Sequence, residues 1–448
     1  MDYCNLHIHT EYSNASCCFL DCMNKLTDVI DYAIKMKMPG VAITDHETLS
    51  AHIPAEQYLD SLIKNAKEED KEYLENFKLL RGNEIYLAKD DMSAATYQSG
   101  DTFYHFILIA LDKEGHDQLR ELSNRAWHRS FFRAVQRRFN YLSDLEEVIG
   151  SNKGHLIGTT ACIGGITGTT FLRGGTKENI KGFIDYFKNV FGEENFFIEL
   201  APPSSVTPDQ ENYNRFMMSN FADEQFVIST DAHYLEKKDF PIFKAFLNSK
   251  QTKEREVENF YSTSYFMDWD EISKYCNKYD VNFLEKCRLN SLKICERAKD
   301  FRLKRTPIIP QIKIPNQFNI DLKCELGKYE FIDKYYNSEF IEDRYLLSKV
   351  FENYDSLIDS KFSIDTICER INLELSELWG ISAALNQRMS NYLITEAKNV
   401  DIIWEDADAI VGPSRGSAGS WVVNYLLGIT QWNPLDHPLE MKHWRLTH

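Results

Sequence analysis

The 448-residue sequence predicts an α/β protein, and three observations support this fold class. Short apolar runs recur through the first half of the chain, each about as long as a buried strand. Longer segments with apolar residues at helical spacing separate these runs, as in strand–helix alternation. A proline-containing stretch at residues 306–315 then marks off a second part that is charged and mainly helical. The first half should therefore form an α/β barrel or a doubly wound sheet.

Seven apolar runs predict the strands of the first half. Most are continuously apolar rather than alternating, as expected for parallel strands that are covered on both faces. The runs lie at residues 5–9, 40–44, 78–80, 106–111, 155–159, 196–200 and 226–230. Between the first two, residues 25–38 predict a helix because apolar side chains recur at helical spacing at Leu26, Val29, Ile30, Ala33 and Ile34. In either fold, chemistry is expected beyond the C-terminal ends of the strands.

The remaining elements are predicted in order along the chain. Residues 271–300 have a helical pattern, and the proline-containing connector follows them. Residues 321–400 are again helical, and a short strand at 409–411, a glycine-bearing turn and a helix at 417–427 come next. We therefore expect a first domain at 1–275, a helical connector and linker at 276–320, and a further domain segment at 321–448.

Composition limits the function classes. The chain has 51 basic and 68 acidic residues and a net charge of −17, which argues against non-specific coating of nucleic acid. An enzyme whose bound metal ions supply positive charge remains compatible with this balance. No apolar run is long enough to cross a membrane, and the first residues lack a signal-peptide pattern. We expect a cytoplasmic protein with reduced cysteines and no membrane partner.

Metal-ligating side chains recur near the ends of the predicted strands. His7 and His9 are two residues apart on one strand and share a face, and Asp231 and His233 repeat this spacing after the seventh run. Single candidates accompany the runs between these pairs, at Asp45, His46, Glu84, His105 and Cys162. Any one of these residues could be a hydrogen-bonded structural side chain. Because imidazole, carboxylate and thiolate groups recur together, the pattern favours a multinuclear metal site.

These residues lie in motifs that resemble a known family. The motifs are HIHTEYS at 7–13, ITDH at 43–46, GNEIY at 82–86, YH at 104–105, Cys162 and TDAHY at 230–234. They resemble the PHP (polymerase and histidinol phosphatase) domain, in particular the one that opens the α subunit of bacterial C-family replicative DNA polymerases, polymerase III. The resemblance implies a distorted seven-stranded β/α barrel.

The resemblance also implies a set of ligands and an activity. Nine positions match the family's pattern for three metal ions, namely His7, His9, Asp21, His46, Glu84, His105, Cys162, Asp231 and His233. Asp231, His233, His46 and Asp45 are the implied catalytic group, with Asp45 orienting a ligand. The implied cofactors are about two to three divalent ions of the Zn²⁺, Mn²⁺ or Mg²⁺ kind, and the implied activity is 3′→5′ exonuclease proofreading. The alternative is a non-catalytic replisome scaffold in which the metals are structural.

A second motif lies near residue 415. The turn GPSRGS at 412–417 opens the predicted helix, and backbone N–H groups there could bind an anion. An ordinary helix capped by Ser417 is the alternative from the turn alone. The run 412–430 resembles the palm motif of the same polymerase family, which implies that Arg415, Gly416 and Ser417 bind the triphosphate of an incoming dNTP. The second domain is therefore expected to be part of a polymerase-β-like palm, which uses Mg²⁺ when complete.

The resemblance places the palm's aspartate pair shortly after residues 436–448. We therefore expect an N-terminal fragment or split subunit without polymerase activity of its own, and with an exposed apolar face that includes part of 422–427. The expected partners are a DNA primer-template, dNTP and a C-terminal polypeptide that completes the palm, fingers and DNA-binding domains, with a sliding clamp and other replisome proteins as further candidates. An independent hydrolase of small phosphoesters would leave the palm motif unexplained.

Overall fold

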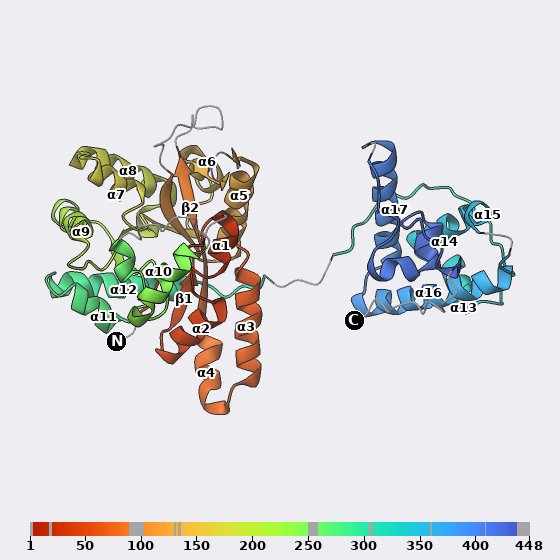
Figure 1. Cartoon of the computed structure of the whole chain (residues 1–448), viewed down its shortest axis with the longest axis horizontal. Helices are drawn as coiled ribbons and strands as arrows, with labels where there is room; N and C mark the ends of the chain where they lie inside the picture. The colour runs from red at the N-terminus through yellow and green to blue at the C-terminus, as the bar shows by residue number, and fades with distance from the viewer. Residues whose placement is uncertain are drawn as a thin grey trace. The chain divides into compact units, whose positions relative to one another are not determined.

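The computed structural model divides the chain into two compact units, Met1–Lys304 and Arg305–His448 (Figure 1). The structure describes residues 3–17, 20–88, 103–129, 131–132, 136–249, 259–303, 308–358, 361–407 and 409–436. Each unit has its own apolar core, with Phe106, Phe187 and Ile198 in the first and Leu346, Ile371 and Val422 in the second. The two units are therefore described separately.

The first unit is built on a curled, seven-stranded mixed sheet. Its main path runs β1 (Gly40–Ile43), β2 (Lys78–Ala88), β3 (Tyr104–Ala110), β7 (Leu156–Thr159), β8 (Phe196–Leu200) and β9 (Phe226–Ile228), and β6 (Asn140–Tyr141) pairs with β2. The N-terminal segment bridges both ends of this path, because Asn5 pairs with Val41 and Ile8 pairs with Ala232. This segment makes the curled sheet a distorted α/β barrel. A separate hairpin joins β4 (Phe131–Phe132) to β5 (Gln136–Arg137).

Helices cover the outside of this barrel (Figure 1). They are α1 (Tyr12–Cys17), α2 (Leu26–Lys35), α3 (His52–Asn65), α4 (Glu68–Asn76), α5 (Lys113–Arg129), α6 (Leu142–Ile149), α7 (Ile166–Leu172), α8 (Lys177–Phe191), α9 (Pro208–Asn220), α10 (Phe240–Asn248), α11 (Trp269–Tyr275) and α12 (Val281–Arg297). Helix α2 buries Leu26, Val29, Ile30 and Ala33, the face that its sequence spacing predicts. Helix α12 packs on β9 and adds Leu284 and Cys287 to the first core, so the compact unit continues past residue 275.

The predicted α/β class with a barrel is confirmed, with local differences. The run at 5–9 forms isolated bridges at Asn5 and Ile8 instead of a strand. Strand β3 runs antiparallel to both β2 and β7, whereas the continuous apolar runs predicted parallel strands. A continuous apolar run reports burial on both faces, and burial does not fix strand direction. Strand β2 also continues to Ala88, beyond its predicted end at residue 80, because buried polar residues such as Asn83 and Glu84 interrupt the apolar pattern.

The second unit contains helices and irregular segments, and no strand among its described residues. Its helices are α13 (Glu330–Tyr336), α14 (Ile341–Glu352), α15 (Tyr354–Leu357), α16 (Ile364–Leu385), α17 (Met389–Glu405) and α18 (Val422–Leu426). The strand expected at 409–411 does not form. The helix expected at 417–427 is also wrong in detail, because a 3₁₀ turn at Gly416–Ser420 and the shorter α18 take its place.

The apolar face that we expected to be exposed in 422–427 is buried. Val422, Val423 and Leu426 are fully buried, and α18 packs against α14 and α16. The neighbouring helices supply apolar partners such as Leu375 and Leu378, which cover this face within the second unit itself. Among the described residues, no helix is long and apolar enough to span a membrane.

Candidate metal centre

The nine predicted ligands come from different elements of the barrel and meet near one end of its strands. His7 and His9 lie on the N-terminal segment between β1 and β9, and Asp231 and His233 follow β9 directly. Glu84 and His105 lie within β2 and β3, while Asp21 precedes α2, His46 follows β1, and Cys162 follows β7. Asp231 adopts a positive φ of 48°, which is uncommon for a residue other than glycine and marks a locally constrained turn.

His7, His9, Glu84 and Asp231 form the most deeply buried group. The Nε2 atoms of His7 and His9 are 3.1 Å apart. Asp231 Oδ1 lies 3.0 Å from His7 Nε2 and 3.1 Å from His9 Nε2. The Glu84 carboxylate lies 3.5 Å from both nitrogens. Donor atoms of four side chains therefore converge on one small space.

Two further groups share residues with the first. His9, His46 and His233 bring ring nitrogens together, and Asp21 Oδ2 lies 2.9 Å from His46 Nε2 and 3.8 Å from His233 Nε2. In the last group, His105 Nδ1 lies 2.7 Å from Glu84 Oε1 and 3.7 Å from Cys162 Sγ. Because His9 and Glu84 each belong to two groups, the nine side chains form one continuous cluster.

The hydrogen bonds around the imidazoles fix which nitrogen can face a metal ion. His7 Nδ1 donates to Glu199 Oε1 at 2.7 Å, and His233 Nδ1 donates to the carbonyl of Asp231 at 2.7 Å. His9 Nδ1 donates to Ser13 Oγ at 3.1 Å. In all three residues Nδ1 donates to a neighbouring oxygen, which leaves Nε2 facing the cluster.

The charges of the cluster also fit bound cations. Burial alone would raise the pKa of Asp231, but His7 and His233 lower it well below its ordinary value. Burial and the neighbouring His46 and His233 rings lower the pKa of His9 to about 3. The buried carboxylates hold positive charge nearby, and against the effect of burial they raise the pKa of His7 and His46 well above its ordinary value. Imidazole, carboxylate and thiolate donors together suit Zn²⁺ or Mn²⁺.

One side of the cluster is open to solvent. The side chains of His7, His9 and Glu84 are 0% exposed, whereas those of His105 and Asp21 are 29% and 19% exposed. Tyr261 lies on this side and donates its hydroxyl to Asp21 Oδ1 at 3.0 Å. A phosphate group could therefore approach the ligand atoms from the side of Asp21 and His105.

Asp45 lies behind the cluster instead of among its donor atoms. Its carboxylate accepts hydrogen bonds from the Thr10 backbone N–H at 2.6 Å and from Ser13 Oγ at 2.7 Å. Since Ser13 in turn accepts from His9, Asp45 acts on the site by positioning His9.

Three of the supporting residues were missed at the sequence level. Glu199, Ser13 and Thr10 hold His7, His9 and Asp45, yet none was singled out. Glu199 had a detectable signal, because it is an acidic residue within the otherwise apolar strand FFIEL. Ser13 and Thr10 carry no comparable signal, since small hydroxyl residues are common next to turns.

The second predicted site lies on an exposed turn of the second unit. Arg415, Gly416 and Ser417 are all exposed, and Gly416 has a φ of +60°, which favours glycine. The turn does not open a helix directly, because α18 begins at Val422. The backbone N–H groups of Val422 and Val423 donate to the Glu374 carboxylate at 2.9 and 2.8 Å. An anion of the protein itself therefore occupies the start of α18.

Two protein families match different regions of the chain. The PHP domain family matches residues 5–202, and the bacterial DNA polymerase III alpha NTPase domain family matches residues 344–445. A solved structure from Bifidobacterium adolescentis, described as a candidate metal-dependent phosphoesterase, is 11% identical with a TM-score of 0.33, and the match covers 63% of this chain and 98% of that one.

Two curated relatives match almost the whole chain. The DNA-directed DNA polymerase of Bacillus phage SPbeta is 37% identical over 467 residues, which cover 99% of this chain and 35% of that polymerase. The DNA polymerase III subunit alpha of Borreliella burgdorferi is 26% identical over 449 residues, which cover 98% of this chain and 33% of that subunit. The chain thus spans about a third of the length of these relatives.

The barrel and its cluster of metal-ligating side chains define a PHP domain. Since the polymerase III alpha family matches the second unit of the same chain, the two regions together are consistent with the N-terminal part of a C-family replicative DNA polymerase. The family resemblance predicted from the sequence motifs is thereby confirmed.

Proposed function

We propose that the cluster is a multinuclear metal centre that hydrolyses phosphodiester bonds at the 3′ end of DNA, as a 3′→5′ exonuclease within a C-family polymerase. The convergence of nine ligand-type side chains into one cluster carries this proposal. When bound, divalent ions at such a site activate water and stabilise the charge that develops on the phosphate oxygens.

The residues of the chain would divide the work by position. His7, His9 and Asp231 would hold an ion at the buried end, where Glu199 and Ser13 orient the two imidazoles. His46, His233 and Asp21 would hold a second, and Glu84, His105 and Cys162 a third. Asp45 supports His9 through Ser13 and does not itself reach the substrate.

The open side of the cluster favours catalysis over a purely structural role for the metals. Structural zinc sites are usually closed by protein ligands, whereas catalytic sites keep a position for water or substrate. The partial exposure of His105 and Asp21 leaves such a position, while the innermost ligands are fully covered. A scaffold that only binds metal would not need this opening.

The exonuclease proposal is tested with a 5′-labelled primer annealed to a longer template, incubated with Mn²⁺, Zn²⁺ or Mg²⁺. We expect stepwise shortening of the primer from its 3′ end. Asp231→Asn should slow this shortening at least about a hundredfold, because it removes a ligand oxygen shared by two imidazoles. Asp209→Asn, an exposed change on α9, is the matched control. Full activity in a metal-free Asp231→Asn variant would refute a catalytic role for the centre.

We further infer that the exposed turn with Arg415, Gly416 and Ser417 contributes to the dNTP triphosphate site of the polymerase. A guanidinium beside a glycine in the left-handed region suits close approach of phosphate oxygens. Primer extension by a polymerase that contains this turn tests the inference, and Arg415→Ala should raise the KM for dNTP. An unchanged KM would contradict the inference.

A further inference from the structure

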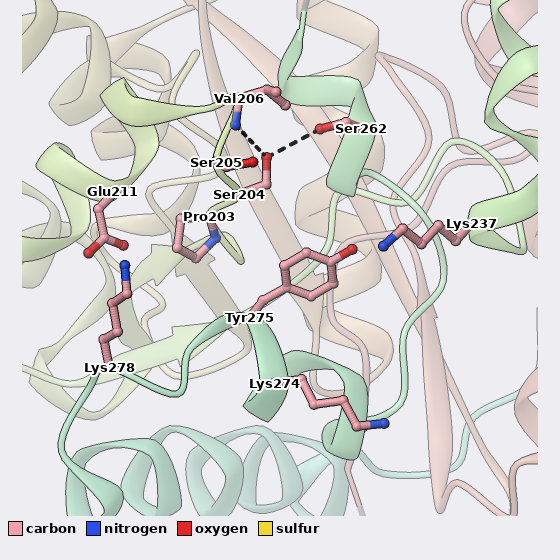
Figure 2. A pocket seen from close by; sticks show the side chains of 10 residues that line it. All are labelled: Pro203, Ser204, Ser205, Val206, Glu211, Lys237, Ser262, Lys274, Tyr275 and Lys278. Carbon is pink, nitrogen blue, oxygen red and sulfur yellow. Dashed lines mark hydrogen bonds between the residues drawn. The ribbon is translucent and has the colours of Figure 1, made fainter.

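A basic pocket lies on the first unit, between chain segments that also carry contacts of the metal centre. It has a volume of about 450 Å³, and its lining includes Lys237, Lys274, Lys278 and Tyr275 (Figure 2). The opposite wall carries the hydroxyl groups of Ser204, Ser205 and Ser262. Ser204 Oγ lies 3.5 Å from Ser262 Oγ, so a hydrogen bond joins two chain segments within this wall.

Three chain segments connect this pocket to the metal centre. Strand β8 carries Glu199, the partner of His7, and the chain reaches the pocket at Pro203. Ser262 follows Tyr261, whose hydroxyl donates to the predicted ligand Asp21. Lys237 follows the predicted ligand His233 by four residues. The pocket and the centre therefore belong to the same end of the barrel.

The charge of the pocket is positive in a protein whose net charge is −17. Lys237, Lys274 and Lys278 are all exposed, and none of them makes an ion pair with another described residue. The acidic lining residue is Glu211, whose two carboxylate oxygens accept from Arg215 Nε at 2.5 Å and from the Tyr279 hydroxyl at 2.7 Å. Because its negative charge is offset by Arg215, the lysines remain available for an external anion.

Tyr275 adds a flat surface to this group. Its ring lies between the lysines in Figure 2, and Lys237 Nζ is 5.3 Å from the ring centre. Tyr275 is half-buried. Cationic side chains beside an accessible aromatic ring, with hydroxyl donors opposite, suit a nucleotide chain, in which phosphates contact the cations and a base stacks on the ring.

We propose that this pocket binds the backbone phosphates and one base of a single-stranded nucleic acid whose 3′ end lies in the metal centre. The proposal rests on the proposed exonuclease function and adds the segment of chain that holds the strand. The lysines take successive phosphates, the serine hydroxyls donate to phosphate oxygens, and Tyr275 stacks on a base. The pocket thereby directs an unpaired end toward the metal ligands.

Binding of a fluorescein-labelled 12-nucleotide oligothymidylate to the full chain with its metals tests the proposal. A phosphorothioate at the last 3′ linkage keeps the strand intact during the measurement. The triple variant Lys237→Gln, Lys274→Gln, Lys278→Gln should weaken binding at least about tenfold and reduce the salt dependence of log Kd by about 2, the loss expected for three phosphate contacts. Tyr275→Ala should weaken binding about fivefold or more, whereas Tyr275→Phe should keep it.

The matched control carries the same charge change elsewhere. The control variant carries Lys64→Gln, Lys67→Gln and Lys71→Gln. These exposed lysines lie in or next to α3 and α4, which precede β2 in the chain. This control should bind within about twofold of the unaltered chain. Equal weakening by the two triple variants would overturn the proposal, because it would reduce the effect to net charge.

Competition separates a strand from a free nucleotide. Excess dTMP or inorganic phosphate should fail to displace the oligonucleotide. Complete displacement by dTMP, at a dTMP concentration equal to a Kd that depends on the lysines, would overturn the assignment to a strand.

The binding measurement does not depend on hydrolysis of the oligonucleotide. Lysine-dependent binding by a chain without nuclease activity would refute the proposed exonuclease and keep the pocket, whereas normal nuclease activity with unchanged binding in the pocket variant would refute the pocket alone.

Discussion

Glu199 shows how single residues shape the proposed metal centre without being ligands. Its carboxylate accepts from His7 Nδ1 at 2.7 Å and also from the Thr159 hydroxyl. These contacts hold the His7 ring in the orientation that points Nε2 at Asp231. A carboxylate behind a metal-binding imidazole fixes its tautomer and increases its basicity.

Replacing Glu199 by Gln should weaken metal binding about tenfold to a hundredfold, because the amide orients His7 less strongly than the carboxylate does. Competition with a fluorescent chelator measures the affinity. Glu194→Gln changes an exposed residue just before the same strand and should leave the affinity unaltered. Equal affinities for the Glu199 variant and the unaltered chain would show that His7 does not need this partner.

At the residue scale, the sequence predicted side chains by their chemical type and motif, and the structure brings all nine predicted ligands into one cluster. What could not be predicted was the set of residues that hold the ligands in position. Asp45 was expected to orient a ligand, but its contacts with Thr10 and Ser13 were not predicted. Such partners depend on the three-dimensional path of loops, which residue type and spacing do not specify.

At the scale of elements, the start of α18 depends on a buried acid from another helix. Glu374 of α16 accepts from Val422 and Val423 and pairs with Arg370. Glu374→Ala should destabilise the second unit by about 3–5 kcal/mol, because it leaves the guanidinium without its acidic partner and two N–H groups without acceptors. Thermal unfolding measures the loss. A drop below about 1 kcal/mol would mean that water replaces the carboxylate at little cost.

A histidine pair joins α3 to α5 and gives the first unit a specific response to acid. His52 Nδ1 lies 3.1 Å from His116 Nε2, and His52 Nε2 donates to the carbonyl of Gly82. Burial, followed by the neighbouring His116, lowers the pKa of His52 from 6.5 to about 3. Burial, followed by Arg81, lowers the pKa of His116 to about 4.

Since both pKa values are lower in the folded state, the unfolded chain binds more protons as the pH falls below 6.5. The stability from the neutral pair should be fully present above pH 6.5 and decline toward pH 4, with a slope of at most about 2.7 kcal/mol per pH unit for two protons. The double variant His52→Gln, His116→Gln should flatten the slope of unfolding free energy against pH, measured by denaturant titration. His128→Gln changes an exposed residue of α5 and should leave the slope unchanged. An unchanged slope in the double variant would contradict this role.

Elements with a continuous apolar pattern were predicted well, and elements with buried polar residues were not. Strands β1, β7 and β8 lie where their apolar runs predict them. Strand β2 was predicted too short because Asn83 and Glu84 serve the site from within it. The start of α18 was misplaced because Glu374, remote in sequence, satisfies its N–H groups.

At the scale of the whole molecule, two units with separate cores should unfold separately. Bound metal stabilises only the unit that contains the ligands, by mass action. Calorimetry should therefore show two transitions, and a chelator should lower the melting temperature of one by about 5 °C or more while leaving the other unchanged. A chelator that shifts both transitions equally, or neither, would contradict this assignment of the metal to the first unit.

The central claim is that nine side chains form one multinuclear metal centre, and the number of ions bound to each chain tests it most directly. Elemental analysis of protein that was purified without chelator should give about two to three divalent ions per chain. Asp231→Asn should lower this number, because Asp231 contacts both His7 and His9. Fewer than about one ion per unaltered chain, in protein that has been dialysed against Zn²⁺ and Mn²⁺, would contradict the account.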